Sequence, residues 1–381
     1  MNSEILRILQ TCFSRSWGGL ELHSLLEAEG VTSLGHSVWF ACCSGSRLEQ
    51  EGKMRGVRML PFQVSGFFHP SVIWRLGRFM RERKIDLVHC QHSKDLATAV
   101  PASRCGFGNV PVVLSKRVGS YIMKRDPLHR FTYSGVRRVL AISEVIRQNV
   151  IDTTPMSPAQ VITLHHGVDV EQFSFLNADR SRVRRELGIG DEEIVIGFMG
   201  RFSAGKGHEE FLAAAATLVT RHRNLRFVIA GEASFGEQEY ERRIKAQSAR
   251  LQLDHAVMFI GFRSDVRDVM ASFDIFAFPS HAESFGAVLV EAMAVERPVV
   301  STNCDGVLDI VVDGKTGLFV NPERPAELAD ALSRLVENPQ LRLQLGKAGR
   351  ERVVELFDRK VLLKKLESVY RETVAEASRN R

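Results

Sequence analysis

Cysteine is scarce in this sequence, and its few cysteines form no pattern that would stabilise a fold or hold a metal. The six cysteines are scattered and two of them are adjacent: Cys12, Cys42, Cys43, Cys90, Cys105 and Cys304. Neither the spacing of a zinc site nor a disulfide framework is present. A reducing compartment is therefore the simplest setting for the protein.

Long hydrophobic runs are also lacking. No apolar stretch approaches the roughly 18–20 residues that span a bilayer. Residues 1–9 contain an early acid and only a short apolar stretch, so we expect no signal peptide there. The chain shows no internal repeat and no low-complexity tract. These observations predict a cytoplasmic protein.

A strong excess of one charge is absent overall but present in one half. The net charge is only +6. Residues 1–180 hold 22 Lys and Arg against 15 Asp and Glu, whereas the remainder holds 29 against 30. The excess in the first half indicates an anionic partner. Basic patches interleaved with aromatics and a helix-turn-helix signal are lacking, which disfavours a nucleic-acid-binding protein, the alternative from another class.

The chain does have the length and pattern of two α/β domains. With 381 residues, 44% hydrophobic and 25% charged, it suits a globular two-domain protein. Short apolar strands alternate with helical patterns, and the series restarts after about residue 170. This alternation predicts two doubly wound, Rossmann-like parallel-sheet domains that face each other across a cleft.

The expected elements follow from the periodicity. We expect strands at 5–9, 38–41, 87–89, 112–114, 138–142, 194–199, 227–230, 257–260, 275–278 and 298–301, and helices at 20–34, 72–84, 208–220, 237–251, 286–294, 326–337, 339–357 and 360–376. We place an N-terminal, acceptor-binding domain at 1–170, a C-terminal, donor-binding domain at 171–358 and a terminal helix at 359–381.

Residues 279–291 carry the most informative pattern, two glutamates around a strand-to-helix junction. A helix that begins near Gly286 would aim its free backbone N–H groups at the loop that carries Glu283. Such a helix end suits a phosphate group. Glu291 would lie inside the helix, roughly 7 Å along its axis, which is about the reach from a diphosphate to its ribose. The same pattern is also typical of a solvated helix face.

A glycine-rich turn opens the second half. Residues 200–207 follow a strand, precede a helix and nearly match a P-loop, but Gly207 stands where a P-loop has the Ser or Thr that holds magnesium. Arg201 and Lys206 in this turn either grip a diphosphate or are simply solvated. Gly18-Gly19 after the first strand lacks the full dinucleotide fingerprint, and indicates either close approach to a ligand phosphate or an ordinary turn.

Taken in order, these motifs resemble those of the family-4 retaining glycosyltransferases, which have the GT-B architecture. The matching segments lie at 18–21, 35–38, 86–92, 166–169, 200–201, 206–207, 273–275, 279–280, 291–293, 298–300 and 314–318, and they extend over nearly the whole chain. The ordered set is highly specific, although no single segment is.

The resemblance implies a hexosyltransferase-type enzyme. It would move a sugar, with retention, from a nucleoside diphosphate sugar such as a UDP-sugar to a glycan or lipid-linked acceptor, in the synthesis of lipopolysaccharide or another cell-surface polysaccharide. Arg201 and Lys206 would hold the diphosphate, and Glu283 would contact the transferred sugar. No metal and no other cofactor is implied. A nucleotide-sugar epimerase of the same architecture is the alternative, which the spacing of Glu283 and Glu291 disfavours.

The resemblance also assigns the other donor contacts. The implied residues are Gly18, Gly19, Phe262, Arg263, Ser284, Phe285, Gly286, Ala287 and Glu291. Among them, Glu291 would accept hydrogen bonds from the ribose hydroxyls, and the loop 261–263 would lie near the base. The terminal helix would cross back to the first domain.

The sequence departs from the family pattern near the donor sugar. Many relatives have a histidine after the third or fourth strand of the first domain, where this chain has residues 114–119. Lys116, Arg117 or His92 would then supply the sugar or acceptor contact. Residues 305–309 replace a more usual Gly-Gly-x-Pro-Glu, which leaves the choice of sugar open.

The segment 72–84 predicts a basic amphipathic helix. Its apolar side chains are Ile73, Leu76, Phe79 and Met80, and its basic side chains are Arg75, Arg78, Arg81, Arg83 and Lys84. The pattern is typical of a sheet-covering helix with a solvated face. It also suits docking to an anionic membrane surface, which would make the protein peripheral at the inner face of the cell membrane.

Overall fold

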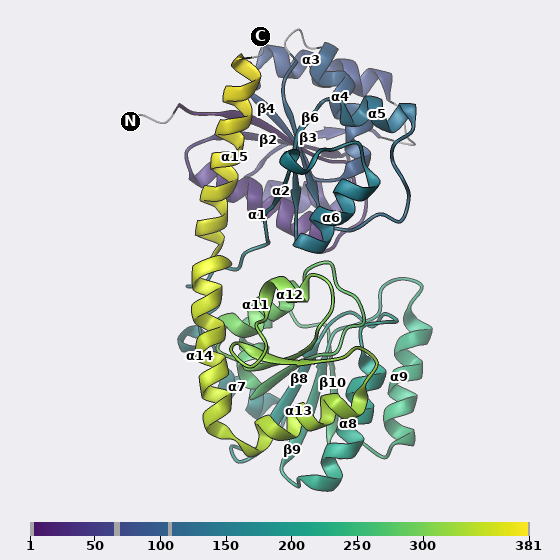
Figure 1. Ribbon diagram of the computed structural model, residues 1–381, viewed down its shortest axis with the longest axis vertical. Helices are drawn as coiled ribbons and strands as arrows, with labels where there is room; N and C mark the ends of the chain where they lie inside the picture. Colours follow the sequence, from purple (N-terminus) through teal and green to yellow (C-terminus); the bar gives the residue numbers. More distant parts are fainter. Residues whose placement is uncertain (1–3, 65–68, 106–108, 380–381) are drawn as a thin grey trace. The chain divides into compact units, whose positions relative to one another are not determined.

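The computed structural model describes residues 4–64, 69–105 and 109–379, and the chain divides into two compact units. Unit 1 comprises Met1–His166 with Lys360–Arg381, and unit 2 comprises Gly167–Arg359. Each unit holds a parallel sheet with helices packed against it (Figure 1). The expectation of two doubly wound, Rossmann-like α/β domains is confirmed.

Unit 1 is built on a seven-stranded sheet with the order β3-β2-β1-β4-β5-β6-β7. The strands are β1 (Arg7–Cys12), β2 (Ser37–Cys43), β3 (Arg58–Phe62), β4 (Leu87–Cys90), β5 (Val112–Lys116), β6 (Val136–Ala141) and β7 (Val161–Thr163). The helices are α1 (Gly19–Ser33), α2 (Arg47–Met54), α3 (Pro70–Glu82), α4 (Leu96–Cys105), α5 (Pro127–Tyr133), α6 (Glu144–Thr153) and α15 (Arg359–Arg379).

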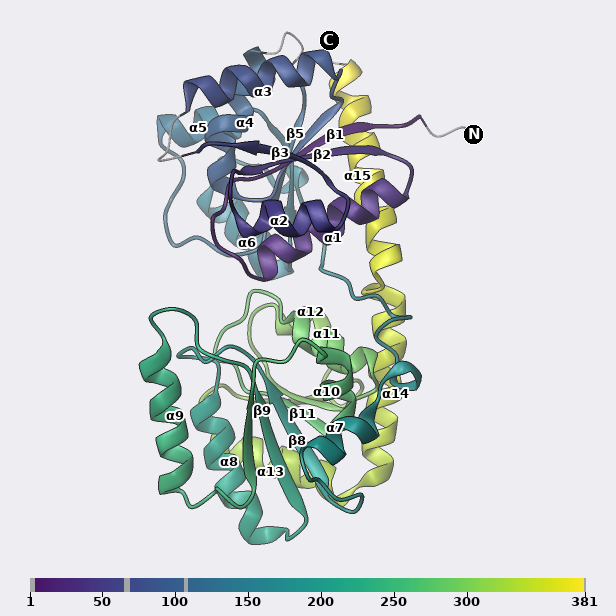
Figure 2. The same ribbon diagram turned by 180° about the vertical axis from the view of Figure 1, so that it is seen from behind.

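The C-terminal helix α15 is part of the core of unit 1. Leu366, Val369 and Tyr370 are buried in one cluster with side chains of α1 and the sheet. A Cβ atom on Gly30 of α1 would lie only 2.4 Å from a methyl group of Leu363, so the two helices approach closely because this position is glycine. Figure 2 shows α15 alongside the sheet and α1.

Unit 2 is built on a six-stranded sheet with the order β10-β9-β8-β11-β12-β13. The strands are β8 (Ile194–Met199), β9 (Leu225–Ala230), β10 (Val257–Gly261), β11 (Ile275–Phe278), β12 (Val299–Thr302) and β13 (Gly317–Val320). The helices are α7 (Arg180–Glu186), α8 (His208–Arg221), α9 (Gln238–Arg250), α10 (Val266–Ser272), α11 (Ala287–Ala294), α12 (Val307–Ile310), α13 (Pro325–Glu337) and α14 (Pro339–Leu356).

The core of unit 2 is apolar on both faces of its sheet. Phe227 and Ile275 from the strands and Phe211 and Leu332 from the helices are fully buried. Strands covered on both faces need continuous apolar runs, which is why β11 reads Ile-Phe-Ala-Phe. Each such side chain stabilises the fold by about 1.5–3 kcal/mol relative to exposure.

The apolar face of α3 packs inside unit 1. Val72, Ile73, Leu76 and Met80 are buried, so this helix covers the sheet as the first of the two interpretations requires. None of the helices in the described part of the chain combines the length and apolarity that crossing a bilayer demands.

Candidate active site

The strand order of unit 2 creates a crevice at one place. The chain winds from β8 outward through β9 and β10, and then returns to β11 on the other side of β8. Loops from such neighbouring strands diverge at their carboxyl ends, where doubly wound proteins bind ligands. Here those loops are residues 200–207 after β8 and residues 279–286 after β11. Both segments were selected from the sequence, and the fold brings them together.

Glycine is required where these two loops touch. Gly207 has φ of 85°, and a Cβ atom there would lie 2.1 Å from the carbonyl oxygen of Pro279. The backbone N–H of His281 donates to the carbonyl of Gly205 at 2.8 Å. The glycine-rich turn therefore packs backbone to backbone against the loop after β11, which fixes the position of Lys206 between them.

Lys206 and Glu283 form the central ion pair of the crevice. The Nζ of Lys206 donates to Oε2 of Glu283 at 2.5 Å. The two side chains are 27% and 19% exposed, so the pair is largely but not completely shielded from water. A charge-assisted bond in such a place is stronger than on an open surface. The sequence selected both residues for the reacting end, and they lie in contact.

The turn after β12 supports Glu283. The backbone N–H of Glu283 donates to Oδ2 of Asp305 at 3.2 Å, and the N–H of Gly306 donates to the carbonyl of Glu283 at 2.9 Å. A Cβ atom on Gly306 would lie 2.3 Å from the carbonyl oxygen of Ser284. From the sequence, residues 305–309 were connected only with the choice of sugar. Their role in positioning the backbone of Glu283 was not predicted. The loop after β12 carried no local signal that it would contact Glu283.

The N-terminus of α11 opens toward the same crevice. Gly286 precedes the helix with φ of 95° and ψ of 53°, and no side chain among the described residues caps it. Uncapped N–H groups at Ala287 and the following residue carry the positive end of the helix dipole. The helix begins within one residue of the predicted position, and an N-terminus of this kind suits an anion. Ser284 and Phe285 form the entry to this helix.

Glu291 lies one turn further along α11. Its side chain is half-buried, and burial raises the pKa of its carboxyl to about 7. Burial is the one cause of this shift, and no charged group of the described residues offsets it. A carboxylate that is partly desolvated and unpaired is suited to accept hydrogen bonds from neutral hydroxyl groups.

Arg201 is the most accessible cation of the glycine-rich turn. Its side chain is 57% exposed, and its Nε lies 3.5 Å from Oε2 of Glu237. An ion pair at that distance and exposure contributes little to stability. The guanidinium therefore remains available to an anionic ligand.

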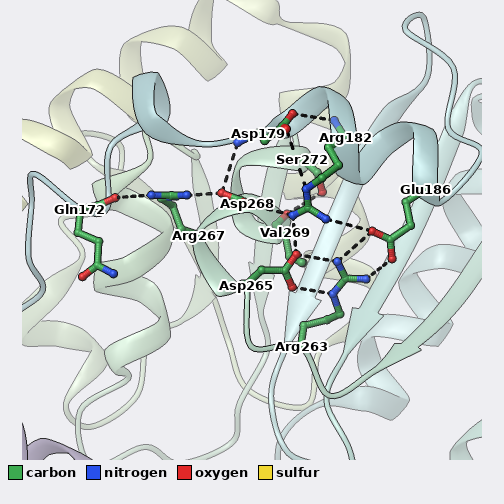
Figure 3. Close-up of polar contacts among 10 residues, drawn as sticks. All are labelled: Gln172, Asp179, Arg182, Glu186, Arg263, Asp265, Arg267, Asp268, Val269 and Ser272. Atoms are coloured by element: carbon green, nitrogen blue, oxygen red, sulfur yellow. Dashed lines mark hydrogen bonds and ion pairs between the residues drawn. The ribbon is translucent and has the colours of Figure 1, made fainter. Parts of the chain in front are cut away.

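Arg263 is held within the protein (Figure 3). Its guanidinium bonds to Glu186 on α7 and to Asp265, which precedes α10. Hydrogen bonds with Asp265 and Glu186 raise the pKa of Arg263, and the bond from Arg263 lowers the pKa of Asp265. Phe262 beside it is 68% exposed, so its ring can stack on a base while Arg263 positions the loop.

The network of Figure 3 continues across α7 and α10. Arg182 donates to Asp265 at 2.7 Å and to Asp268 at 3.0 Å, and Arg267 donates to Asp268 at 2.9 Å. These bonds hold the loop 261–265 against α7. The predicted donor contacts at Phe262 and Arg263 therefore lie on a braced loop after β10, two strands away from β8.

In unit 1, Gly18 and Gly19 lie where the sequence placed them, at the start of α1. Gly18 precedes the helix in an extended conformation with φ of −170°, and no side chain of the described residues caps the helix. A Cβ atom on Gly19 would meet only a ring carbon of His23, at 4.0 Å. The space around this residue is open, as close approach of a ligand to the backbone requires.

The three residues considered for the missing histidine lie in different environments. His92 follows β4, and its Nδ1 accepts from the backbone N–H of Lys94 at 3.1 Å. Burial lowers its pKa. Lys116 ends β5 and is buried beside Lys124, and burial together with repulsion from Lys124 lowers the pKa of Lys116 to about 8.

Arg117 belongs to a buried polar network. Its guanidinium donates to Oε1 of Gln91 at 2.7 Å and to Nε2 of His166 at 2.8 Å, and it lies 3.6 Å from Glu27. Burial lowers its pKa, and Glu27 opposes that shift. These bonds favour a positioning role in unit 1 over direct contact with a sugar or acceptor.

Comparisons with known proteins agree with this geometry. The model of the Glycosyltransferase Family 4 matches residues 17–172, and the model of the Glycosyl transferases group 1 matches residues 179–352. The first match ends and the second begins shortly after the boundary between the units at His166 and Gly167, and together they cover most of the chain.

Individual relatives point the same way. The chain is 28% identical over 63% of its length to a capsular polysaccharide biosynthesis glycosyltransferase, CapM, of Staphylococcus aureus, and the aligned stretch spans 62% of that protein. It is 26% identical over 86% of its length to an α-D-kanosaminyltransferase of Streptomyces kanamyceticus, with 90% of that protein covered. The fold matches that of Anabaena HepE, solved in complex with UDP-glucose, with a TM-score of 0.81, 23% identity and coverage of 96% and 100%. The chain belongs to the family-4, group 1 glycosyltransferases and is a glycosyltransferase of GT-B fold.

Proposed function

We propose that this glycosyltransferase transfers a hexose, with retention, from a UDP-sugar to a glycan or lipid-linked acceptor in the synthesis of a cell-surface polysaccharide such as lipopolysaccharide. The observation that carries the proposal is the Lys206–Glu283 pair beside the uncapped N-terminus of α11. The pairing of a fixed cation with free helix N–H groups suits the diphosphate of a nucleotide sugar.

The donor is proposed to bind along the crevice between the loops after β8 and β11. Lys206, Arg201 and the N–H groups at the start of α11 would hold the two phosphates. Glu291 would accept hydrogen bonds from the ribose hydroxyls one helical turn away, and Phe262 would stack on the base. HepE, whose structure contains UDP-glucose, supports a uridine nucleotide for a protein of this fold.

The same groups would lower the barrier to transfer. Breaking the bond between the anomeric carbon and the phosphate oxygen leaves negative charge on the diphosphate and positive character on the sugar. Lys206, Arg201 and the helix N–H groups stabilise that separated charge more than the intact donor. Glu283 would lie beside the cationic sugar. The acceptor hydroxyl would attack from the side of the leaving group, and the phosphate oxygen would take its proton.

We expect no metal ion to be required, because Lys206 and Arg201 would supply fixed positive charge at the phosphates. Among the residues that the structure describes, no group of three or more His, Cys, Asp or Glu side chains is arranged to hold a metal. Metal-independence stays a prediction, as does retention.

A panel of nucleotide sugars offered with cell-envelope glycolipid extracts tests the proposal. We expect transfer from a UDP-sugar, persistence of activity in EDTA, and the donor's α configuration in the product by proton NMR. Lys206→Ala should slow transfer by about 10²–10³, while Lys245→Ala, which removes a lysine paired with Glu241 on α9, serves as the matched control. An inverted product, or loss of activity on chelation, would contradict the proposal.

A further inference from the structure

The loop after β5 and the helix α5 together present an unusual surface, defined here as residues 118–131. Six of the 17 large apolar side chains that are exposed in the described part of the chain lie in this segment: Val118, Tyr121, Ile122, Met123, Leu128 and Phe131. Their exposed fractions run from 47% to 106%. Scattered exposed apolar side chains are ordinary, but such a concentration within 14 residues marks an interaction surface.

Cations surround these apolar side chains. Lys124, Arg125 and Arg130 lie within the segment. The guanidinium of Arg104 on α4 lies 4.9 Å from the ring centre of Phe131 and bonds only to the hydroxyl of Ser134 among the described residues. Arg125 donates to the backbone carbonyls of Ile151 and Thr154, so its charge is not neutralised.

Acidic groups are almost absent from the same surface. Asp126 is the one acid of the segment, and it is engaged in capping α5 through the N–H groups of Leu128 and His129 and in pairing with the His129 ring. An exposed apolar surface with a surplus of positive charge is complementary to an anionic bilayer, which offers both hydrocarbon and phosphate.

A pocket at the edge of the segment provides a place for one phosphate. It has a volume of about 330 Å³, and its lining includes the apolar side chains Ile122 and Leu128 together with Lys94, Lys124 and Tyr133. The Tyr133 hydroxyl is buried, and although Ser93 is close by, no atom of the described residues hydrogen-bonds to it. A buried hydroxyl without a partner beside two lysines fits a ligand oxygen.

The basic helix α3 is a weaker candidate for the same role. Its arginines are exposed, but its apolar side chains pack inside unit 1. Arg75 and Arg78 lie over the rings of Phe62 and Trp74. Apart from Trp74, this helix would offer charge to a bilayer but little apolar surface.

We propose that residues 118–131 dock unit 1 on an anionic lipid bilayer, with the pocket beside Lys94, Lys124 and Tyr133 receiving a lipid phosphate. The lipid-linked class of acceptor follows from this only if the proposed transferase function also holds. Docking itself is measurable without sugar transfer.

Co-sedimentation of the intact protein with vesicles tests the proposal. One set contains phosphatidylcholine with an equal part of phosphatidylglycerol, and the other contains phosphatidylcholine alone. We expect binding to the anionic set at low salt. Ile122→Ser with Met123→Ser should weaken it at least tenfold, and Lys124→Gln with Arg130→Gln on the order of fivefold per charge.

Three controls make the result specific. Phe235→Ser removes a fully exposed aromatic side chain from unit 2. Arg75→Gln with Arg81→Gln removes charge from α3. Both variants should bind vesicles as the wild type does. UDP retention and melting temperature should be unchanged in all variants, so failure of the nucleotide site and failure of docking appear separately. The proposal would be overturned if the wild type bound anionic and neutral vesicles equally, or if only the α3 variant lost binding. It would also be overturned if the variants of residues 118–131 changed the molecular mass of the protein in solution without changing vesicle binding.

Discussion

The two units share a winding pattern but place their polar groups differently. In unit 1, polar side chains of β4, β5 and α1 turn inward: Gln91 donates to Glu27 at 2.6 Å, and His89 lies 2.6 Å from the hydroxyl of Tyr370 on α15. In unit 2, the sheet interior is apolar, and Lys206 and Glu283 lie at the open ends of the strands. Similar topology thus places a buried polar network in one unit and a partly exposed ion pair in the other.

This difference indicates how to separate stability from function. Charges that satisfy one another inside a protein hold its structure, and their removal leaves a buried partner uncompensated. Charges that face an open crevice can bind a ligand, and their removal leaves the fold nearly unchanged.

The largest expected effect distinguishes two arginines. Arg117→Ala removes a buried guanidinium that bonds to Gln91 and His166 and lies 3.6 Å from Glu27, so we expect the free energy of unfolding of unit 1 to fall by about 3–5 kcal/mol. Arg201→Ala should change stability by no more than about 0.5 kcal/mol, because its side chain is mostly exposed. All three tryptophans, Trp17, Trp39 and Trp74, belong to unit 1, so tryptophan fluorescence in urea follows that unit.

The opposite ranking is expected for activity. Arg201→Ala should lower kcat/KM for the donor, and the stable fraction of Arg117→Ala should retain UDP. If Arg117→Ala and Arg201→Ala lost stability equally, the proposed distinction between structural charges in unit 1 and ligand-binding charges in unit 2 would be wrong.

Lys206→Ala should produce the next largest effect. Loss of a fixed cation at the departing diphosphate is expected to lower kcat by about 10²–10³, with weaker UDP binding and a nearly unchanged melting temperature. Steady-state kinetics and calorimetry measure the two quantities. Wild-type kinetics in this variant would show that the crevice of unit 2 is not the donor site, whereas Lys245→Ala should behave as the wild type.

Gly207→Ala tests how closely the two loops of unit 2 must approach. The substitution combines φ of 85° with a Cβ atom 2.1 Å from the Pro279 carbonyl, so we expect a loss of stability of about 1–3 kcal/mol and loss of UDP binding. Gly205→Ala has a similar φ of 79° but meets no atom within 4 Å, and it is the matched control for backbone strain alone. If thermal unfolding showed the same loss of stability in Gly207→Ala and Gly205→Ala, the contact between the two loops would contribute nothing to stability.

The smallest expected effect is a pH dependence at Glu291. Burial raises the pKa of this carboxyl to about 7, so it is charged above and neutral below that pH. A charged carboxylate accepts ribose hydroxyls better, so KM for the donor should rise as the pH falls from 8 to about 6. In Glu291→Gln this dependence should vanish, and Glu291→Ala should weaken binding at every pH. A wild-type KM that stays constant over this range would contradict the assignment.

The same shift has a consequence for stability. Because the folded state holds the Glu291 proton more tightly than the unfolded state, its contribution to stability is lost as pH rises from about 4.5 through 7. Glu291→Gln should therefore gain on the order of 2–4 °C in melting temperature relative to wild type at pH 8, and little at pH 4. Thermal scans at the two pH values measure this difference.

Much of the fold could be predicted from the sequence, because buried parallel strands require short apolar runs, and such runs allow few other structural interpretations. The predicted strand at 275–278 has the bounds of β11, and the helix after Gly286 begins one residue late. The strands β3, β7 and β13 were missed. β7 has only three residues, β3 contains a proline and is partly exposed, and β13 opens with glycine, so each lacks a clear apolar run.

The site was predictable only where chemistry is local. Arg201, Lys206 and Glu283 stood out because they flank strand-to-helix turns with glycines. The pairing of Arg263 with Glu186 and of His89 with Tyr370 joins residues 77 and 281 positions apart, and no short-range pattern announces such contacts. The sugar or acceptor contact expected for Arg117 stays a prediction, and no short-range pattern indicates its bonds to Gln91 and His166.

A crystal structure of the protein with UDP bound tests the central claim most directly. We predict that the diphosphate lies at the N-terminus of α11, within hydrogen-bonding distance of Lys206 and Arg201, with the ribose on Glu291 and no metal ion bridging the phosphates. A diphosphate bound elsewhere in unit 2, or held through a coordinated divalent cation, would contradict it.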